Sequence, residues 1–220
     1  MILAYDHGLE HGPVDFNHYS IKPEYILNLA QIGGFDAIVL QKGLAEYYYD
    51  QQLPLVIKLN GKTSLKKGDP VSRQICSVQE AKDLGASAVG YTVYLGSKYE
   101  PIMLRELGSI EEEAEELGLP VIGWMYGKAD SSYSARVGLE MGLDAVKIKA
   151  DDKLALAMEA AGEMPVYVSG GNKTTHQKFL ENARNYMEIR AYGIIAGRNI
   201  WQHKDPLAIS KDLRKIIYPS

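Results

Sequence analysis

The sequence contains almost no cysteine, which limits how its fold can be held together. Its one cysteine, Cys76, has no second cysteine with which to form an intrachain disulfide. This excludes the disulfide-stapled folds of small secreted proteins, and we expect a reducing, cytoplasmic location. The first residues also lack the basic and then apolar layout of a secretory signal peptide.

Long apolar runs and an excess of positive charge are missing as well. No apolar stretch approaches the roughly 20 residues that a membrane-spanning helix needs. The formal net charge of -4 argues against nucleic acid as the main partner. With 220 residues, 46% of them hydrophobic, the sequence has enough apolar side chains for a full α/β core. Without a linker or a low-complexity segment, we expect residues 1–220 to form a single domain.

Short β-branched, apolar runs alternate along the chain with longer amphipathic segments. The strand-like runs are residues 2–5, 36–40, 55–59, 88–93, 121–125, 145–149, 166–169 and 193–196. Helix-like segments between them include residues 78–84, 110–117, 131–141, 153–161 and 175–189. Repeated strand–helix units of this kind predict an α/β fold, a (β/α)₈ TIM barrel. The alternative is an open, doubly wound sheet, but no G-x-G-x-x-G motif follows the first strand.

One short segment brings together four side chains of metal-binding type. "DHGLEHGP", which begins at Asp6, contains the H-x-x-E-H pattern of certain zinc peptidases in His7, Glu10 and His11. That pattern requires a helix, which places both histidines on one face. Gly8 interrupts the pattern and a Gly-Pro pair follows it, and both disfavour a helix. We therefore expect a loop that leaves the carboxyl end of the first strand.

The sixth strand-like run carries lysines where a barrel strand should be apolar. Barrel strands are covered on both faces, yet this run reads "AVKIKA". Lys147 and Lys149 are two residues apart and therefore point to the same side. A strand end with both lysines in water would explain the pattern. In a closed barrel, however, we favour lysines in the mouth, where burial and nearby cations lower the pKa of an ammonium group.

A neutral amine in a barrel mouth is a nucleophile for carbonyl carbon, and the chemistry it indicates is Schiff-base formation. Lys147 lies one pleat deeper than Lys149, about 6–7 Å along the strand. We expect Lys147 to be the nucleophile. Lys149 lies nearer the mouth of the barrel and is expected to stay charged. Its ammonium group is then available to a substrate phosphate or hydroxyl.

Two other runs end in aromatic or polar residues. The fifth reads "VIGWMYGK", in which Trp124 and Tyr126 share a face. Trp124 also suits an ordinary core position. Tyr126 lies at the end of its strand, beside the lysine strand. Its phenol can act as an acid or a base if a lysine lowers its pKa. The third run, "VIKLNGKT", places Lys58 and Asn60 on one face, either as site residues or as ordinary loop polarity.

Two glycine-containing loops follow the seventh and eighth strands. They read "SGGNKT", residues 169–174, and "AGRNIWQ", residues 196–202. Glycines let backbone amides approach an anion, and the amino end of a following helix adds a favourable dipole. Arg198 adds a charged fork. A phosphate site after strands seven and eight is frequent in this fold, so the two loops together indicate a phosphorylated ligand.

Together these segments resemble the archaeal-type class I fructose-bisphosphate aldolases, which are related to deoxyribose-phosphate aldolase. The matching stretches, in the family's order and over essentially the whole chain, are "DHGLEHGP", "KLNGKT", "GWMY", "DAVKIK", "VSGGNKT" and "AGRNIWQ". The resemblance implies a barrel whose Lys147 forms a Schiff base with dihydroxyacetone phosphate. It further implies that no metal or other cofactor is needed, that the partner is a phosphorylated sugar, and that the protein forms a homo-oligomer.

The resemblance also implies roles for other residues. Tyr126 matches the family's general acid/base, Asp6 an aspartate that assists the carbinolamine and imine steps, and Trp124 a pocket aromatic. His11 is then a contact to substrate or scaffold in place of a zinc ligand. The implied phosphate cradle consists of Ser169, Gly170, Gly171, Gly197 and Arg198.

The chain departs from the family after the strand-five tyrosine. Where the family commonly has Pro-Arg-Gly, this sequence has Gly-Lys-Ala, so Lys128 replaces the arginine expected at a distal phosphate.

Two other functions stay open. One is a related Schiff-base synthase for another sugar phosphate, as in archaeal synthesis of aromatic-amino-acid precursors. The other is a non-catalytic sugar-phosphate-binding barrel, against which the set of Asp6, Tyr126 and Lys147 argues.

Overall fold

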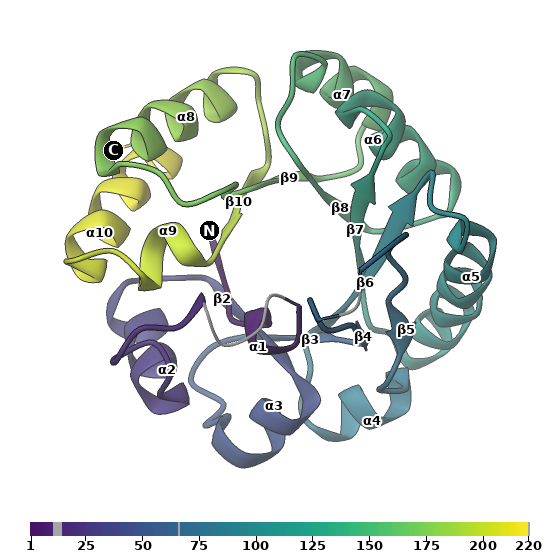
Figure 1. The fold of residues 1–220 in the computed structure, drawn as a ribbon, viewed down its shortest axis with the longest axis horizontal. Helices are drawn as coiled ribbons and strands as arrows, with labels where there is room; N and C mark the ends of the chain where they lie inside the picture. Colours follow the sequence, from purple (N-terminus) through teal and green to yellow (C-terminus); the bar gives the residue numbers. More distant parts are fainter. Residues whose placement is uncertain (11–14, 66, 220) are drawn as a thin grey trace.

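The computed structural model describes residues 1–10, 15–65 and 67–219. Its strands form a closed barrel in the order β1-β10-β9-β8-β7-β6-β3-β2, with helices arranged around the outside (Figure 1). All strand pairs of this barrel are parallel, and β1 pairs with β2 on one side and with β10 on the other. The predicted (β/α)₈ barrel is therefore confirmed, and the open sheet is excluded.

The barrel strands coincide with the eight predicted runs. They are β1 (Ile2–Ala4), β2 (Ala37–Gln41), β3 (Leu55–Lys58), β6 (Ala88–Leu95), β7 (Val121–Gly127), β8 (Ala145–Ile148), β9 (Val166–Ser169) and β10 (Gly193–Ala196). The helices are α1 (His7–Glu10), α2 (Pro23–Ile32), α3 (Lys42–Tyr48), α4 (Val78–Asp83), α5 (Glu100–Leu117), α6 (Ser131–Glu140), α7 (Leu154–Ala161), α8 (His176–Glu188), α9 (Arg198–Trp201) and α10 (Pro206–Ile217). In the described part of the chain, none of them is both long and apolar enough to cross a membrane.

The apolar core has two layers, which the barrel wall separates. The outer and larger layer fills the space between the strands and the surrounding helices. The inner layer fills the barrel itself and consists of Ile2, Ala4, Ala37, Val39, Val56, Ile122, Trp124, Ala145 and Ile195. The inner layer forms an apolar floor below the carboxyl ends of the strands, and polar side chains above that floor are held out of bulk water.

A small hairpin, β4 (Asn60–Gly61) and β5 (Arg73–Gln74), lies in the connection between β3 and α4 and was not predicted. Asn60 explains why it forms there. Its buried side-chain amide donates to the carbonyls of Ser72 and Thr92, at 3.0 and 2.9 Å, and its Oδ1 accepts the Thr92 amide at 2.9 Å. Asn60 is therefore a structural residue that fixes the hairpin to β6.

The loop predicted directly after β1 is wrong for residues 7–10, which form the one-turn helix α1. Gly8 is tolerated in this turn because the neighbouring contacts outweigh its propensity cost of about 1 kcal/mol. The His7 ring packs edge-on against Trp201, with 5.1 Å between ring centroids, and Gly8 lies against Phe16. One turn of helix is enough to aim side chains at the barrel mouth.

Candidate active site

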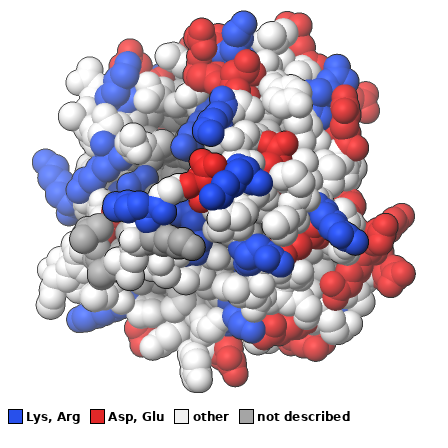
Figure 2. Space-filling model, turned by 45° about the vertical axis from the view of Figure 1, so that its right-hand side comes forward, with Lys and Arg blue, Asp and Glu red and all other residues white. Residues whose placement is uncertain are grey.

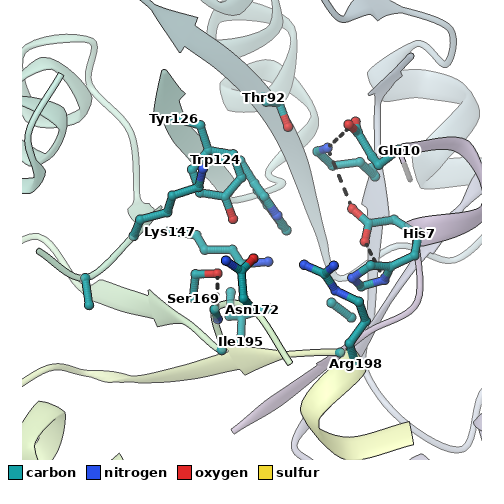
Figure 3. Close-up of a pocket in the computed structure, with 18 of the residues that line it drawn as sticks. His7, Glu10, Thr92, Trp124, Tyr126, Lys147, Ser169, Asn172, Ile195 and Arg198 are labelled. Carbon is teal, nitrogen blue, oxygen red and sulfur yellow. Dashed lines mark hydrogen bonds and ion pairs between the residues drawn. The ribbon is translucent and has the colours of Figure 1, made fainter. Parts of the chain in front are cut away.

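The carboxyl ends of the strands surround a cavity of about 540 Å³, a size typical of small-molecule sites. Side chains from α1, the strands and α9 point into it (Figure 3). Figure 2 shows Lys and Arg side chains near the centre of the face, with Asp and Glu between them. The predicted residues that line the cavity are Asp6, Lys58, Trp124, Tyr126, Lys147, Lys149, Ser169, Gly170, Gly171, Gly197 and Arg198. The predicted contact His11 lies outside the described residues.

Lys147 projects from β8 onto the apolar floor, and only 6% of it is exposed. Burial lowers the pKa of its ammonium group. Asp6 and Glu10 oppose this shift, Lys58 and Arg198 reinforce it, and the result is a pKa of about 8. About one amine in ten is then neutral at pH 7, far more than for a lysine in water. Lys147 is therefore available as a nucleophile near neutral pH.

Lys149 differs from Lys147 in depth, as predicted. It lies beyond the last residue of β8 and is exposed, with its Nζ 5.2 Å from the centroid of the Tyr126 ring. It lines the outer part of the cavity. The two lysines thus share a side of the strand, but only Lys147 is taken out of water.

Asp6 and Lys58 form a buried ion pair beside Lys147. Lys58 Nζ lies 3.7 Å from Asp6 Oδ2, and the two residues are 1% and 6% exposed. Burial alone would raise the pKa of the Asp6 carboxyl, but the charges of Lys58, His7 and Lys147 outweigh it and lower the pKa. Asp6 is therefore an anion next to the candidate nucleophile. Of the undecided pair on the third strand, Lys58 reaches the cavity and Asn60 does not.

Tyr126, the last residue but one of β7, lies at the rim of the same cavity. Burial raises the pKa of its phenol well above the ordinary value, although a hydrogen bond with Ser169 opposes the shift. The condition considered from the sequence, a pKa lowered by a lysine, is not met, because loss of water around the phenolate has the larger effect. Tyr126 is consequently protonated near neutral pH.

Trp124 lines the cavity although it is almost fully buried, with only 2% of the residue exposed. Gly90 on the adjacent strand makes room for it, because a Cβ at that position would lie 2.3 Å from the indole ring. Lys58 Nζ and Lys147 Nζ lie 5.3 and 5.1 Å from the centroid of the ring. Both amines therefore lie over the face of the indole. The π-face of the ring attracts cations, and this interaction helps to hold the two side chains in place.

The two predicted phosphate loops lie side by side at the cavity, joined by a buried amide. Asn199 Nδ2 donates to the carbonyls of Gly170 and Asn172, at 2.7 and 3.0 Å, and Asn199 Oδ1 accepts the Thr174 amide at 2.9 Å. The loop after β9 is thereby fixed to the loop after β10. Arg198, with 22% of its side chain exposed, points into the cavity beside them.

The dipole of the helix that follows β10 contributes less to anion binding than expected. α9 has four residues, which is too short for a substantial dipole. Gly197 at its start has a second use: a Cβ there would lie 2.3 Å from the His7 ring. Positive charge in this part of the cavity comes instead from the Arg198 guanidinium.

The zinc hypothesis does not describe this geometry. Glu10 turns toward Lys58 and Lys62, 3.5 and 3.9 Å from their Nζ atoms. Within residues 1–10, 15–65 and 67–219, no group of three His, Cys, Asp or Glu side chains could hold a metal.

Lys128 does not line the cavity and is 72% exposed at its side chain, 3.8 Å from Asp69.

Sequence reasoning missed several lining residues, among them Thr92 and Tyr94 on β6 and Asn172 after β9. Thr92 and Tyr94 were detectable, since they are two residues apart on a barrel strand, the same spacing as Lys147 and Lys149. In the register of the sheet Thr92 pairs with Trp124 and Tyr94 with Tyr126. Asn199 had no such pattern, because it acts only through backbone groups of the neighbouring loop.

A closed barrel with a buried lysine of lowered pKa, a carboxylate, a phenol and two glycine loops at its mouth defines the class of barrel enzymes equipped for imine chemistry. The chain belongs to the DeoC/LacD family of aldolases, which it matches over residues 1–203.

Relatives and solved structures of this kind cover nearly the whole chain. It is 48% identical to "Fructose-bisphosphate aldolase class 1" of Thermoproteus tenax, over 99% of this chain and 89% of that protein. The corresponding protein of Halobacterium salinarum is 38% identical, over 99% of this chain and 90% of that protein. Among solved structures, an archaeal fructose-1,6-bisphosphate aldolase whose catalytic lysine is covalently bound to the carbinolamine intermediate is 48% identical. It superimposes with a TM-score of 0.95, over 99% of this chain and 93% of that one.

Proposed function

We propose that this chain is a class I fructose-bisphosphate aldolase. It is a lyase that reversibly cleaves fructose 1,6-bisphosphate to dihydroxyacetone phosphate and glyceraldehyde 3-phosphate. The observation that carries the proposal is Lys147, a buried amine with a pKa of about 8 at the mouth of the barrel. The proposal is supported by 48% identity to a protein of that name and to a solved archaeal aldolase with a covalent lysine intermediate.

Substrate binding is assigned to the two glycine loops. The backbone amides of the loop after β9 and the Arg198 guanidinium hold one phosphate at the inner side of the cavity. This brings the C2 carbonyl of the ketose to Lys147. Lys58 and Lys149, which line the same cavity, are assigned to the remaining oxygens of the substrate.

The chemistry begins when the neutral Lys147 amine attacks C2. The carbinolamine that forms loses water to give an imine, with the Asp6 carboxylate as the nearest anion to accept and return protons. The protonated imine draws the electron pair of the C3–C4 bond as that bond breaks, so no metal and no cofactor is needed. Cleavage leaves an enamine, which takes up a proton at C3 in exchange for the one that the C4 hydroxyl lost and becomes an imine again. Hydrolysis of this imine then releases dihydroxyacetone phosphate.

Tyr126 is assigned to the proton on the C4 oxygen. Burial raises its pKa and keeps the phenol protonated. In the direction of synthesis the phenol donates this proton to the aldehyde oxygen, which becomes a more basic alkoxide as the carbon–carbon bond forms. Cleavage retraces the same step in reverse, so it starts from the Tyr126 phenolate, which the charge of Arg198 favours, and the C4 hydroxyl proton returns to the tyrosine oxygen. The imine itself does not require Tyr126.

Borohydride reduction tests the assignment of the nucleophile. Treatment with dihydroxyacetone phosphate and borohydride should add one reduced adduct, and peptide mass spectrometry should locate it on Lys147. Lys147→Ala should abolish both labelling and turnover, whereas Lys149→Ala should keep the label. An adduct on Lys149 or Lys58 would overturn the residue assignment. Loss of activity in a chelator, restored by zinc, would overturn the imine mechanism itself.

We further propose that the enzyme is a cytoplasmic homo-oligomer. Large aromatic side chains on the outer surface support an assembly, among them Tyr47 and Tyr19, which are 77% and 61% exposed. The unpaired, buried thiol of Cys76 supports a reducing compartment. Light scattering coupled to gel filtration tests the assembly, and a mass equal to the monomer at micromolar concentration would refute it.

A further inference from the structure

Glu10 is a buried acidic residue that no step of the proposed reaction uses. It ends α1, and 10% of its side chain is exposed. Its Oε1 lies 3.5 Å from Lys58 Nζ, and its Oε2 accepts a hydrogen bond from the Tyr94 phenol at 3.1 Å. Lys62 Nζ approaches the same carboxylate at 3.9 Å from the outer side. A carboxylate held by this many partners has one fixed orientation.

Lys58 is the residue that connects Glu10 to the reacting groups. Its ammonium is 1% exposed and stands between two carboxylates, 3.5 Å from Glu10 and 3.7 Å from Asp6. Figure 3 draws these two contacts as dashed lines that meet at one lysine amine. The ammonium also lies over the same indole ring of Trp124 as Lys147. Lys58 is therefore placed by Glu10 on one side and acts on Asp6 and Lys147 on the other.

The charges around Lys147 come from several elements. The cations are Lys58 on β3, Lys149 after β8 and Arg198 on α9, and the anions are Asp6 after β1 and Glu10 on α1. Other titratable groups of the cavity include the phenols of Tyr126 on β7 and Tyr94 on β6, Lys62 after β4, and His7 on α1, whose Nδ1 lies 3.6 Å from Asp6 Oδ1. Lys58 and Arg198 favour a neutral Lys147, whereas Asp6 and Glu10 favour the ammonium. Removing Glu10 alters this balance twice, by deleting one anion and by freeing Lys58.

We propose, building on the proposed aldolase function, that Glu10 is a positioning residue. Together with Tyr94 it holds the Lys58 ammonium beside Asp6, in the place from which Lys58 favours the neutral form of the Lys147 amine. Tyr94 serves as a permanent donor to Glu10, because burial and the adjacent carboxylate raise the pKa of its phenol and keep it protonated. Without Glu10, Lys58 has a single carboxylate partner and moves onto Asp6, which then accepts protons less readily.

The pH dependence of kcat/KM for fructose 1,6-bisphosphate tests this role, because it reports the pKa values of the free enzyme. Deleting the Glu10 anion with Glu10→Gln should move the acidic limb of the profile to lower pH by about 0.5 unit or more. Glu10→Asp retains the charge and should keep the limb in place while lowering kcat. Glu116→Gln makes the same chemical change at an exposed position of α5 and should leave the profile unaltered.

A second background shows whether Glu10 acts through Lys58. Lys58→Met should move the limb to higher pH, because it removes a cation near Lys147. In that background the further change Glu10→Gln should have little effect on kcat, since no ammonium is left to position. An equal loss of kcat in both backgrounds would overturn the proposal, as would an unmoved limb in Glu10→Gln.

Trapping with borohydride separates this proposal from the function on which it rests. No adduct on the unaltered enzyme would refute the aldolase mechanism, whereas an adduct together with an unchanged Glu10→Gln profile would refute only the role of Glu10.

Circular dichroism checks that Glu10→Gln folds. If it does not fold, Tyr94→Phe decides: it keeps the charge but loses the hydrogen bond, and kcat should fall about 3-fold or more. Normal kcat in folded Tyr94→Phe would overturn the proposal.

Discussion

The fold takes the ammonium group of Lys147 out of water, as its proposed role as nucleophile requires, and the same burial makes it a source of instability. Its pKa falls from 10.5 to about 8 on folding. Below pH 8 the folded chain must hold a buried cation that the unfolded chain hydrates, at a cost of about 3 kcal/mol. Between pH 8 and 10.5 the unfolded chain binds more protons than the folded one, so the free energy of unfolding rises with pH in this window.

Replacing Lys147 by methionine should therefore stabilise the protein while abolishing catalysis. At pH 7 we expect the free energy of unfolding to rise by about 1–3 kcal/mol, less than the full cost because Asp6 loses a partner. The gain should shrink as pH rises from 8 toward 10.5. Urea unfolding of the variant at pH 7 and pH 10 measures both. Lys149→Met, at an exposed position, should change neither value, and a gain independent of pH would show that burial of the charge is not its cause.

Tyr126 should matter for carbon–carbon cleavage but not for imine formation. Tyr126→Phe should slow cleavage by about 10²–10⁴-fold, the usual effect of losing a general acid or base. Borohydride should still trap dihydroxyacetone phosphate on the variant enzyme. Steady-state turnover and adduct mass, measured on the same preparation, separate the two steps. Normal turnover would mean that Asp6 or a water molecule carries this proton.

At the scale of the residue, side chains on strands were the easier part of the site to predict. Lys147 and Tyr126 could be recognised because a barrel strand has a two-residue period and an apolar norm that they break. The pKa of Tyr126 could not be predicted, since its direction depends on how much water the folded cavity excludes. No role was predicted for Glu10 once the metal pattern had been set aside, because the sequence does not show that its carboxylate faces Lys58 from β3.

At the scale of the element, Asn199 joins the loops after β9 and β10, and the proposed anion site depends on this connection. Arg198 stands on α9 directly beside this joint and supplies its charge. Arg198→Ala should weaken phosphorylated substrates by about 1.5–3 kcal/mol and barely affect an unphosphorylated sugar. Comparing KM for both kinds of substrate measures the difference. Arg184→Ala, exposed on α8, serves as the matched control, and equal losses on both substrates would mean that Arg198 is structural.

The strands could be predicted, whereas some of the short elements between them could not. Each barrel strand is a buried apolar run, so its composition alone identifies it. α1 contains a glycine, and contacts with Phe16 and Trp201 hold it in place; the latter lies at the far end of the sequence. The hairpin β4–β5 depends on hydrogen bonds from Asn60 to distant carbonyls. Elements of this kind depend on tertiary contacts rather than on local propensity.

At the scale of the whole molecule, Cys76 serves as a probe of whether the α4 region opens without global unfolding. The residue is 2% exposed, and burial raises the pKa of its thiol to about 12. Because the thiolate is the reactive form, we expect no reaction with a disulfide reagent at pH 8 in the native protein and complete reaction in denaturant. Absorbance of the released thiol measures both. Rapid, stoichiometric labelling of the native protein would mean that the α4 region opens without global unfolding.

The pairing of Leu3 with Ala196, which closes the barrel, has a consequence for how the protein is made. Most barrel strands can pair with a neighbour soon after translation, but this seam joins the first strand to the last. At about 5–20 residues per second, a ribosome takes about 10–40 s to synthesise the chain that separates them. During that time β1 presents an open hydrogen-bonding edge, the feature of a sheet most prone to pair with another chain. The nascent enzyme is thus most exposed to aggregation, and to capture by chaperones, until β10 has emerged.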